Sequence, residues 1–348
     1  MKPTYDISKS FEWNYDHGPV FAGDMPPRKM PEKKVKILDF ELNSKIGVPA
    51  GPLLNSNWVK FYAQMGFDIP VYKTVRTVKY QVHHHPNCVY VKIKGQIKKE
   101  DIGGNIEGSS EKYPNISEPT ITNSFGMPSD PDKWQDDIGL ANSYLSEGQI
   151  MVVSVVGTPG ESDLAEDYAK CAKMAKEAGA KIIEANYSCP NVASGEGSIY
   201  VDPEFSSQIS KKIKKAIGDT PLFIKVGYFE DKRVLEEVVK KNAPFVQGVS
   251  GINTISMAVR DQDGNQALPG KGRLTSGLCG HAIRDLSREF IRDLNKIRDS
   301  EKYDFVICGV GGITQKEDFA GHFNAGCDIA MAATGAMWNP FLAKELGT

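Results

Sequence analysis

Long apolar runs are missing from this sequence. No stretch reaches the roughly 20 apolar residues that a membrane-spanning helix needs, and the first residues, MKPTYDISKSFEWNYDHGP, lack the apolar core of a secretory signal peptide. The six cysteines form no CxxC pair and show no spacing typical of a zinc or iron–sulfur site. We therefore expect a cytoplasmic protein without a membrane partner and without a metal centre.

An excess of one charge is missing as well. The 42 basic and 44 acidic residues are spread without a long block of one sign. Proteins that bind nucleic acids usually carry clustered basic residues, so no nucleic-acid partner is expected, and a small-molecule substrate is favoured. The three adjacent histidines at 83–85 are a weak metal signal, because neighbouring side chains of a strand point to opposite faces.

Eight short apolar runs alternate with amphipathic stretches along the chain. They are IGVPA, DIPVYKT, QIMVVSVV, KIIEANY, PLFIKV, VQGVSGINTI, DFVICG and DIAMAAT. A chain of 348 residues is long enough for one large barrel or two smaller domains, and no linker divides this one. We predict an α/β fold, a (β/α)8 TIM barrel over residues 41–348, preceded by an extension of residues 1–40 that wraps around it.

Helix-start signals follow several of these runs. Ser162 is a candidate N-cap, Asp202 with Pro203 fits the N-cap and first helical position, and Thr314 with Glu317 forms a capping-box pattern. Two connections, residues 75–122 and 256–280, are too long for simple turns and are expected to be binding loops. In such a barrel the loops after the strands carry the chemistry.

Two lysines stand at the ends of apolar runs. Lys73 ends IPVYK and Lys225 ends PLFIK, so both should reach the rim of the barrel that carries the site. Each alone is expected to extend its ammonium group into water. Together they could hold an anionic ligand, support negative charge on a reduced flavin, or form a Schiff base.

Glycine-rich turns and polar side chains mark the same rim. Gly311 and Gly312 precede one predicted helix, and Thr334 and Gly335 follow the last apolar run. These are the two loops in which such barrels bind phosphate through backbone N–H groups. Four asparagines fall at or near strand ends and could hold a planar, amide-rich ring; they are Asn123, Asn186, Asn191 and Asn253. Cys189 lies among them, either as a buried apolar residue or as a reactive thiol.

The segments VYKT, NSFGMPS, NYSCPNV, FIKV, INTI and VGGIT resemble the class 1 dihydroorotate dehydrogenases. The likeness covers about residues 45–345 and implies an FMN-dependent barrel that oxidises dihydroorotate to orotate in pyrimidine biosynthesis. It implies that Cys189 is the catalytic base, which removes the C5 proton while hydride passes from C6 to N5 of FMN. Class 2 enzymes use serine at that position and add a hydrophobic amino-terminal helix, and neither is found in this sequence.

The resemblance also assigns ligand contacts. The residues that it implies for the substrate are Lys73, Asn123, Phe125, Gly126, Met127, Asn186, Asn191, Asn253 and Thr254. The residues that it implies for FMN are Ala50, Gly51, Lys73, Thr74, Asn186, Lys225, Ser276, Gly277, Gly311, Gly312, Thr334 and Gly335. A homodimer, or a separate electron-transfer subunit, is the protein partner that such enzymes have.

The sequence departs from the family pattern in places. Tyr187 replaces an aliphatic residue in the NxSCPN motif, and residues 256–280 are only loosely similar. Three alternatives therefore stay open: an FMN enzyme for another dihydropyrimidine, a Schiff-base lyase that uses Lys73 or Lys225, and a barrel that binds a ligand without catalysis. The electron acceptor is not encoded in these motifs, because the chain has no nicotinamide fingerprint.

Overall fold

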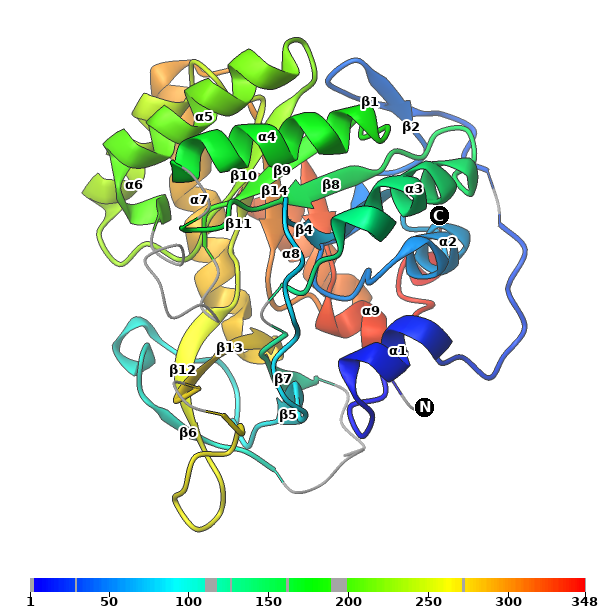
Figure 1. Ribbon diagram of the computed structural model, residues 1–348, viewed down its shortest axis with the longest axis vertical. Coiled ribbons are helices and arrows are strands. Elements are labelled where there is room, and N and C mark those ends of the chain that lie inside the picture. The colour runs from blue at the N-terminus through cyan, green and yellow to red at the C-terminus, as the bar shows by residue number, and fades with distance from the viewer. Residues whose placement is uncertain are drawn as a thin grey trace.

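The computed structural model describes residues 3–28, 30–109, 118–125, 127–160, 163–188, 199–270 and 273–347. Its centre is a closed barrel of eight parallel strands (Figure 1). In chain order the strands are β3 (Ile46–Val48), β4 (Ile69–Val75), β8 (Val152–Val155), β9 (Ile182–Asn186), β10 (Leu222–Lys225), β11 (Gly248–Gly251), β14 (Val306–Val310) and β15 (Ile329–Met331). Pairing of β15 with β3 closes the ring. Each predicted apolar run supplies one strand, so the predicted (β/α)8 TIM barrel is confirmed.

Helices surround the barrel and follow its strands. They are α2 (Ser56–Gln64), α3 (Pro131–Ser143), α4 (Leu164–Glu177), α5 (Pro203–Ile217), α6 (Lys232–Asn242), α7 (Arg284–Glu301), α8 (Lys316–Ala325) and the short α9 (Thr334–Trp338). Single 3-10 turns occur at η1 (Lys99–Asp101), η3 (His281–Ile283) and η4 (Lys344–Leu346). Within the described ranges, no helix is both long and apolar enough to cross a bilayer.

The helix starts confirm one predicted cap and correct two. Asp202 caps α5 and accepts a hydrogen bond from the N–H of Phe205, as predicted. The cap of α4 is Asp163, whose carboxylate accepts from two N–H groups of the first turn; the predicted Ser162 lies outside the described residues. A carboxylate at this position is also favoured by the helix dipole.

The predicted capping box of Thr314 and Glu317 is wrong by one residue. Gln315 is the N-cap of α8, and Asp318 completes the box. The Asp318 carboxylate also accepts the N–H of Thr314 at 3.0 Å, so the threonine precedes the helix. The helix itself begins at Lys316, one residue later than a cap at Thr314 predicts.

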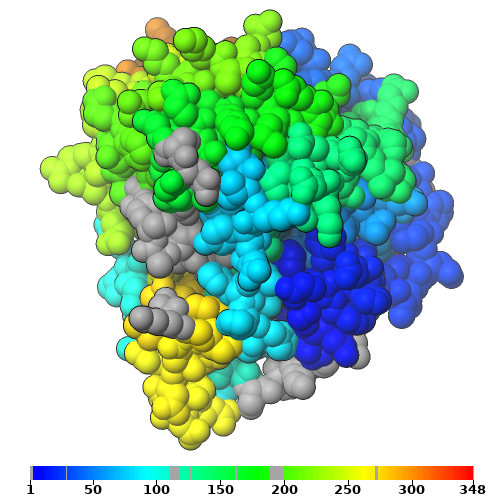
Figure 2. Space-filling view, viewed as in Figure 1, coloured from blue at the N-terminus to red at the C-terminus, as the bar shows by residue number. Residues whose placement is uncertain are grey.

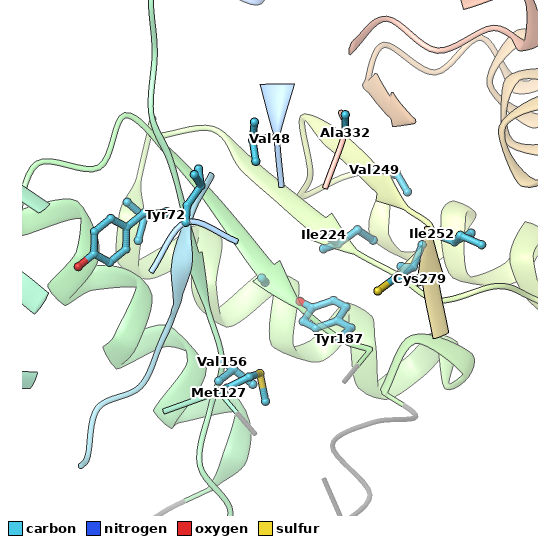
Figure 3. Packing of buried hydrophobic residues seen from close by; sticks show 14 of the residues in the cluster. Val48, Tyr72, Met127, Val156, Tyr187, Ile224, Val249, Ile252, Cys279 and Ala332 are labelled. Atoms are coloured by element: carbon cyan, nitrogen blue, oxygen red, sulfur yellow. The ribbon is translucent and has the colours of Figure 1, made fainter. Parts of the chain in front are cut away.

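The apolar residues form two layers on the two sides of the barrel wall. The outer layer packs the strands against the helices and includes Val48, Ile224 and Val249, which are labelled in Figure 3. The inner layer fills the lower barrel; its members include Val71, Val152, Ile182, Phe223 and Cys308. Parallel strands that are buried on both faces consist of nearly continuous apolar residues. All eight barrel strands could therefore be predicted from the apolar runs of the sequence.

A hairpin covers the end of the barrel at which the strands begin. It consists of β1 (Val35–Ile37) and β2 (Phe40–Leu42), which pair antiparallel. Ile37 and Leu42 are buried in the same cluster as the inner barrel layer. The predicted division of the chain at residue 40 stays a prediction, and it falls within β2.

The N-terminal arm, residues 3–28, packs against α2: the Thr4 hydroxyl lies 2.7 Å from that of Tyr62, and the ring of Tyr5 lies 6.3 Å from that of Trp58. It contains the helix α1 (Phe11–His17). Its backbone is tied to the C-terminal region, because the N–H of Thr4 donates to the carbonyl of Met337 at 2.8 Å. In the space-filling view the arm, in blue, lies against the cyan segment that follows β4 (Figure 2).

The two long connections form a second sheet, which the sequence did not predict. Its strands are β5 (Cys88–Tyr90), β6 (Asn105–Glu107), β7 (Thr120–Asn123), β12 (Ile255–Arg260) and β13 (Thr275–Gly280), in the order β5-β7-β13-β12-β6. β7 from the first connection pairs antiparallel with β13 from the second. The backbone groups of the two connections therefore pair with each other, in a sheet that lies below the barrel in the view of Figure 1.

Candidate functional site

Two adjoining cavities lie at the end of the barrel where the strands finish. They have five lining residues in common: Gly51, Asn123, Lys225, Asn253 and Thr254. The first cavity is also lined by Ala50, Lys73, Thr74, Phe125, Met127 and Asn186. The second extends to Gly311, Gly312 and Thr334. Most of the predicted site residues that the structure describes therefore converge on one continuous space.

Lys73 enters this space from β4. Its side chain is buried, with 8% of its surface exposed, and its ammonium nitrogen lies 5.0 Å from the centre of the Phe125 ring. The backbone of β4 is held at this point by a hydrogen bond from the N–H of Lys73 to the carbonyl of Leu53 at 3.0 Å. A desolvated ammonium group above an aromatic face is a stabilised cation, so Lys73 offers a positive charge to the cavity.

Phe125 is supported in turn by the N-terminal arm. The ring of Tyr5 lies 5.1 Å from that of Phe125, and the ring of Phe11 lies 5.3 Å from it in an edge-to-face arrangement. These contacts connect residues at the start of the chain to the wall of the site. They were not predicted, because no local pattern relates residues 5 and 11 to residue 125.

Lys225 enters from β10 and is 5% exposed. Its ammonium nitrogen lies 3.3 Å from the hydroxyl oxygen of Ser250 on β11. Burial lowers the pKa of Lys225, and the nearby Glu184 carboxylate on β9 acts in the opposite direction. The cavity therefore holds a second cation, which has an acidic neighbour.

Three of the four predicted asparagines meet at the mouth. The side-chain N–H2 of Asn253 lies 3.2 Å from Oδ1 of Asn186 and also donates to the carbonyl of Ser188. The N–H of Ser188 donates to the same Asn186 oxygen. Asn123 lies across the cavity at the end of β7. Amide groups held in this way can pair with the N–H and C=O edges of a planar ring.

Asn123 is anchored through the second sheet. Its backbone carbonyl accepts a hydrogen bond from the hydroxyl of Ser276 at 3.0 Å, and its side-chain oxygen lies 3.3 Å from the N–H of Phe125. Ser276 and Gly277 were predicted to touch the cofactor. That contact stays a prediction; the residues of β13 that line the second cavity are Cys279 and Gly280, and Ser276 is connected to the site by its hydrogen bond to Asn123.

The two glycine-rich loops come together as predicted. Gly311 and Gly312 have φ of 122° and 78°, a region that favours glycine. A Cβ atom on Gly335 would lie 2.3 Å from the carbonyl oxygen of Ile313, so the loop after β15 packs directly on the loop after β14. Thr334 and Gly335 open α9, and the first N–H groups of a helix have no intrahelical acceptor. This pair of loops can bind a phosphate.

A buried histidine supports the first of these loops. His322 on α8 is 0% exposed, and its Nε2 lies 2.9 Å from the carbonyl oxygen of Gly311. Burial lowers the pKa of His322 to about 4. Its Nδ1 lies 2.9 Å from the carbonyl oxygen of Asp318, so backbone groups hold the ring on both sides.

Three predicted residues, Gly126, Cys189 and Asn191, lie outside the described residues. The neighbouring Tyr187 is described and explains one departure from the family pattern. Its hydroxyl lies 2.8 Å from that of Ser210 on α5, and the centre of its ring lies 5.7 Å from that of Tyr168 on α4. Tyr187 thus packs on the helix side of β9, away from the cavity.

Two cavity residues were missed by the sequence analysis. Glu184 and Ser154 line the first cavity beside Lys73 and Lys225. The signal for Glu184 was present, because a charged residue inside the apolar run KIIEANY needs a buried partner. Ser154 gave no such signal.

A further hollow adjoins the site on the outside of the barrel. It lies between α1, residues 80–85 and the start of α3, and it reaches Lys73 and Thr74. Tyr72, on the same strand, forms part of its wall and donates a hydrogen bond to Asp137 at 2.6 Å. The N-terminal arm therefore lines this hollow directly and supports the wall of the site through Phe125.

Comparison with known proteins shows similarity along the whole chain. A family model described as dihydroorotate dehydrogenase matches residues 115–346. The chain is 41% identical to dihydroorotate dehydrogenase of Dictyostelium discoideum, over 99% of this chain and 96% of that protein. It is 28% identical to the catalytic subunit of dihydroorotate dehydrogenase B (NAD(+)) of Staphylococcus carnosus (strain TM300), over 60% of this chain and 68% of that protein.

A solved structure supports the fold. The crystal structure of the dihydroorotate dehydrogenase of Eimeria tenella, in complex with ferulenol, superimposes with a TM-score of 0.70 at 16% identity. The match covers 90% of this chain and 82% of that one. At this identity the likeness concerns the barrel architecture.

Proposed function

Because the chain belongs to the dihydroorotate dehydrogenase family, we propose that it oxidises dihydroorotate to orotate in pyrimidine biosynthesis, with FMN as its cofactor. The observation that carries the proposal is the cavity at the barrel mouth. It gathers Lys73 and Lys225 with Asn123, Asn186 and Asn253 in one space. Two cations and three amides suit a ring with several polar edges and a carboxylate.

The described residues fit FMN. A Cβ atom on Gly51 would meet no atom within 4 Å, although Gly51 lines both cavities; a flat ring can therefore lie against this backbone. Lys225 and Thr74 would border the ring, and the loops at Gly311–Gly312 and Thr334–Gly335 would bind the phosphate through N–H groups. When bound, FMN supplies the acceptor for the hydride that leaves C6 of the substrate.

The residues of the chain have distinct roles in this proposal. The asparagines hold the pyrimidine ring, and the Lys73 cation binds the substrate carboxylate. Cys189 removes the proton from C5 as a thiolate. Its loop begins at Ser188, whose N–H and carbonyl are both bound by the Asn186 and Asn253 amides. The network that contacts the ring would therefore also fix the start of the base loop.

Absorption spectroscopy tests the proposal. The purified protein should be yellow and should release FMN when it is denatured. Under anaerobic conditions, dihydroorotate should bleach the flavin band, while dihydrouracil, which lacks the carboxylate, should bleach it far more slowly. A colourless protein that cannot be reconstituted with FMN contradicts the cofactor assignment. Faster bleaching by dihydrouracil than by dihydroorotate contradicts the substrate assignment and favours another dihydropyrimidine.

The homodimer, the electron-transfer subunit and the cytoplasmic location stay predictions. Support for a partner subunit comes only from the relatives named as catalytic subunits, which match a smaller part of this chain than the Dictyostelium protein does. Sedimentation of the purified protein would give its oligomeric state.

A further inference from the structure

A buried carboxylate stands directly beside the proposed cofactor site and has no part in the chemistry above. Glu184 lies in the middle of β9 and is 2% exposed. It faces Ser154 of β8 and Phe223 of β10 in the strand register, and it lines the same cavity as Lys73 and Lys225. Burial of a charged group at this depth is costly unless the charge has a partner.

Ser250 connects this carboxylate to Lys225. The Ser250 hydroxyl lies 3.3 Å from the Lys225 ammonium nitrogen and is hydrogen-bonded to the Glu184 carboxylate. Ser250 is 0% exposed and lies opposite Lys225 in the register of β10 and β11. The hydroxyl has one proton, so it donates to the carboxylate and accepts from the ammonium group. Three neighbouring strands thus supply one acid, one hydroxyl and one base.

This polar set forms a distinct layer of the barrel. The apolar interior begins directly beside it, at Phe223, the register partner of Glu184, and at Cys308, the register partner of Ser250. Burial raises the pKa of Glu184, and the Lys225 charge and the Ser250 hydrogen bond oppose that rise. The carboxylate therefore offsets part of the ammonium charge in a place where neither group has bulk water beside it.

We propose that Glu184 is a positioning residue that acts through Lys225: it anchors the ammonium group by way of Ser250 and balances its charge, and thereby lowers the reduction potential of the bound cofactor. The inference rests on the proposed function, because it requires a flavin in the cavity. A cofactor that gains negative charge on reduction is stabilised by the Lys225 cation. A carboxylate next to that cation offsets part of this stabilisation.

The midpoint potential of the bound flavin tests this inference directly. Glu184→Gln keeps the size and hydrogen-bonding shape of the side chain but removes its charge. We expect the reduced form to become about tenfold more favoured, a rise of ~30 mV for a two-electron couple. A role in packing alone predicts an unchanged potential, because the exchange is nearly isosteric. An unchanged potential in folded, flavin-loaded Glu184→Gln overturns the inference.

Two further variants make the result specific. Ser154→Ala changes an uncharged residue that lines the same cavity, opposite Glu184, and should leave the potential at the parent value. A shift equal to that of Glu184→Gln would mean that any change in this layer moves the potential, and it would overturn the inference. Glu184→Asp withdraws the carboxylate by one methylene, so its potential should lie between those of the parent and Glu184→Gln.

The aspartate variant also decides the matter if Glu184→Gln does not fold. A potential equal to the parent value in Glu184→Asp then overturns the inference, and a raised one supports it. Failure of the proposed function looks different, because the parent protein would then hold no flavin at all, and both proposals would be wrong. If the parent holds flavin and is reduced by dihydroorotate while Glu184→Gln leaves the potential unchanged, only the Glu184 inference fails.

Discussion

The ammonium nitrogen of Lys73 lies 5.0 Å from the centre of the Phe125 ring. The ring is held on its other sides by Tyr5 and Phe11 of the N-terminal arm. The position of a proposed substrate-binding cation thus depends on residues that come from the start of the chain. This dependence can be separated from simple packing by mutation.

Replacing Phe125 with Leu should weaken orotate binding by about 1 kcal/mol, because the aromatic face below Lys73 is lost while an apolar side chain remains. The measurement is a titration of the flavin spectrum with orotate. Phe11→Leu is the matched control, since Phe11 packs on Phe125 but forms no cation–aromatic pair with Lys73. An equal loss of affinity in both variants would show that packing alone is responsible.

Asn123→Ala should weaken orotate binding by about 1 to 3 kcal/mol and leave FMN bound, because polar groups of the buried ligand lose their partner. The same spectral titration measures it. Asn142→Ala serves as a control: Asn142 lies on α3 and binds the carbonyl of Gly179 at 3.0 Å, outside the cavity. Parent-like affinity in Asn123→Ala would mean that the ring binds elsewhere.

A side chain at Gly51 should exclude the cofactor without preventing folding. A Cβ atom on Gly51 would have no neighbouring atom within 4 Å, so Leu in its place would project into the cavity. We expect Gly51→Leu to be folded and colourless, as judged by circular dichroism and absorption. Gly139→Leu makes the same exchange on the exposed face of α3, where space is also open, and should keep its flavin. If Gly51→Leu binds a full equivalent of FMN, the flavin does not bind in this cavity.

Cys189→Ala should slow flavin reduction by dihydroorotate by about 10²–10⁴-fold, the usual contribution of a general base. FMN and orotate binding should persist. Cys189→Ser should also be slow near neutral pH and recover partly as pH rises, because a hydroxyl is harder to deprotonate. Stopped-flow bleaching gives the rates. Cys171→Ala is the control, since this buried thiol lies in the core of α4; a near-normal rate in Cys189→Ala would refute the base assignment.

Acid should destabilise the fold in part through His322. Its pKa is lowered to about 4 in the folded protein, against about 6.5 in an unfolded chain. The contribution to stability is complete above pH 6.5 and is lost as pH falls from 6.5 to 4, by about 3 kcal/mol at most. Urea unfolding between pH 4.5 and 7.5 should therefore show a shallower pH dependence in His322→Gln. The same slope in both proteins would contradict this account.

The sequence located the barrel because its strands are buried on both faces. Runs such as KIIEANY and DFVICG contain β9 and β14 almost without interruption. Cap positions were harder to assign, because adjacent residues compete as acceptors. Asp163 caps α4 where Ser162 was expected, and Gln315 caps α8 where Thr314 was expected. One-residue errors of this kind do not move the helices.

The second sheet and the aromatic support of Phe125 could not be predicted, for one physical reason. β7 consists of Thr120–Asn123 and pairs with β13 at Thr275–Gly280. Such short strands carry too little periodicity to stand out, and their partners lie far away in the chain. The polar site residues were predictable where they end apolar runs, as Lys73 and Lys225 do. Glu184 lies inside such a run and was overlooked.

Because β15 pairs with β3 to close the barrel, the barrel cannot be completed until the end of the chain has been synthesised. The two strands lie about 280 residues apart, so at ~5–20 residues per second the first strand waits roughly 15 to 60 s on the ribosome for its neighbour. The hydrogen bond from the N–H of Thr4 to the carbonyl of Met337 forms at least as late. The nascent chain therefore carries an open, unpaired edge of β3 through most of its synthesis, and chaperones have that whole interval in which to bind it.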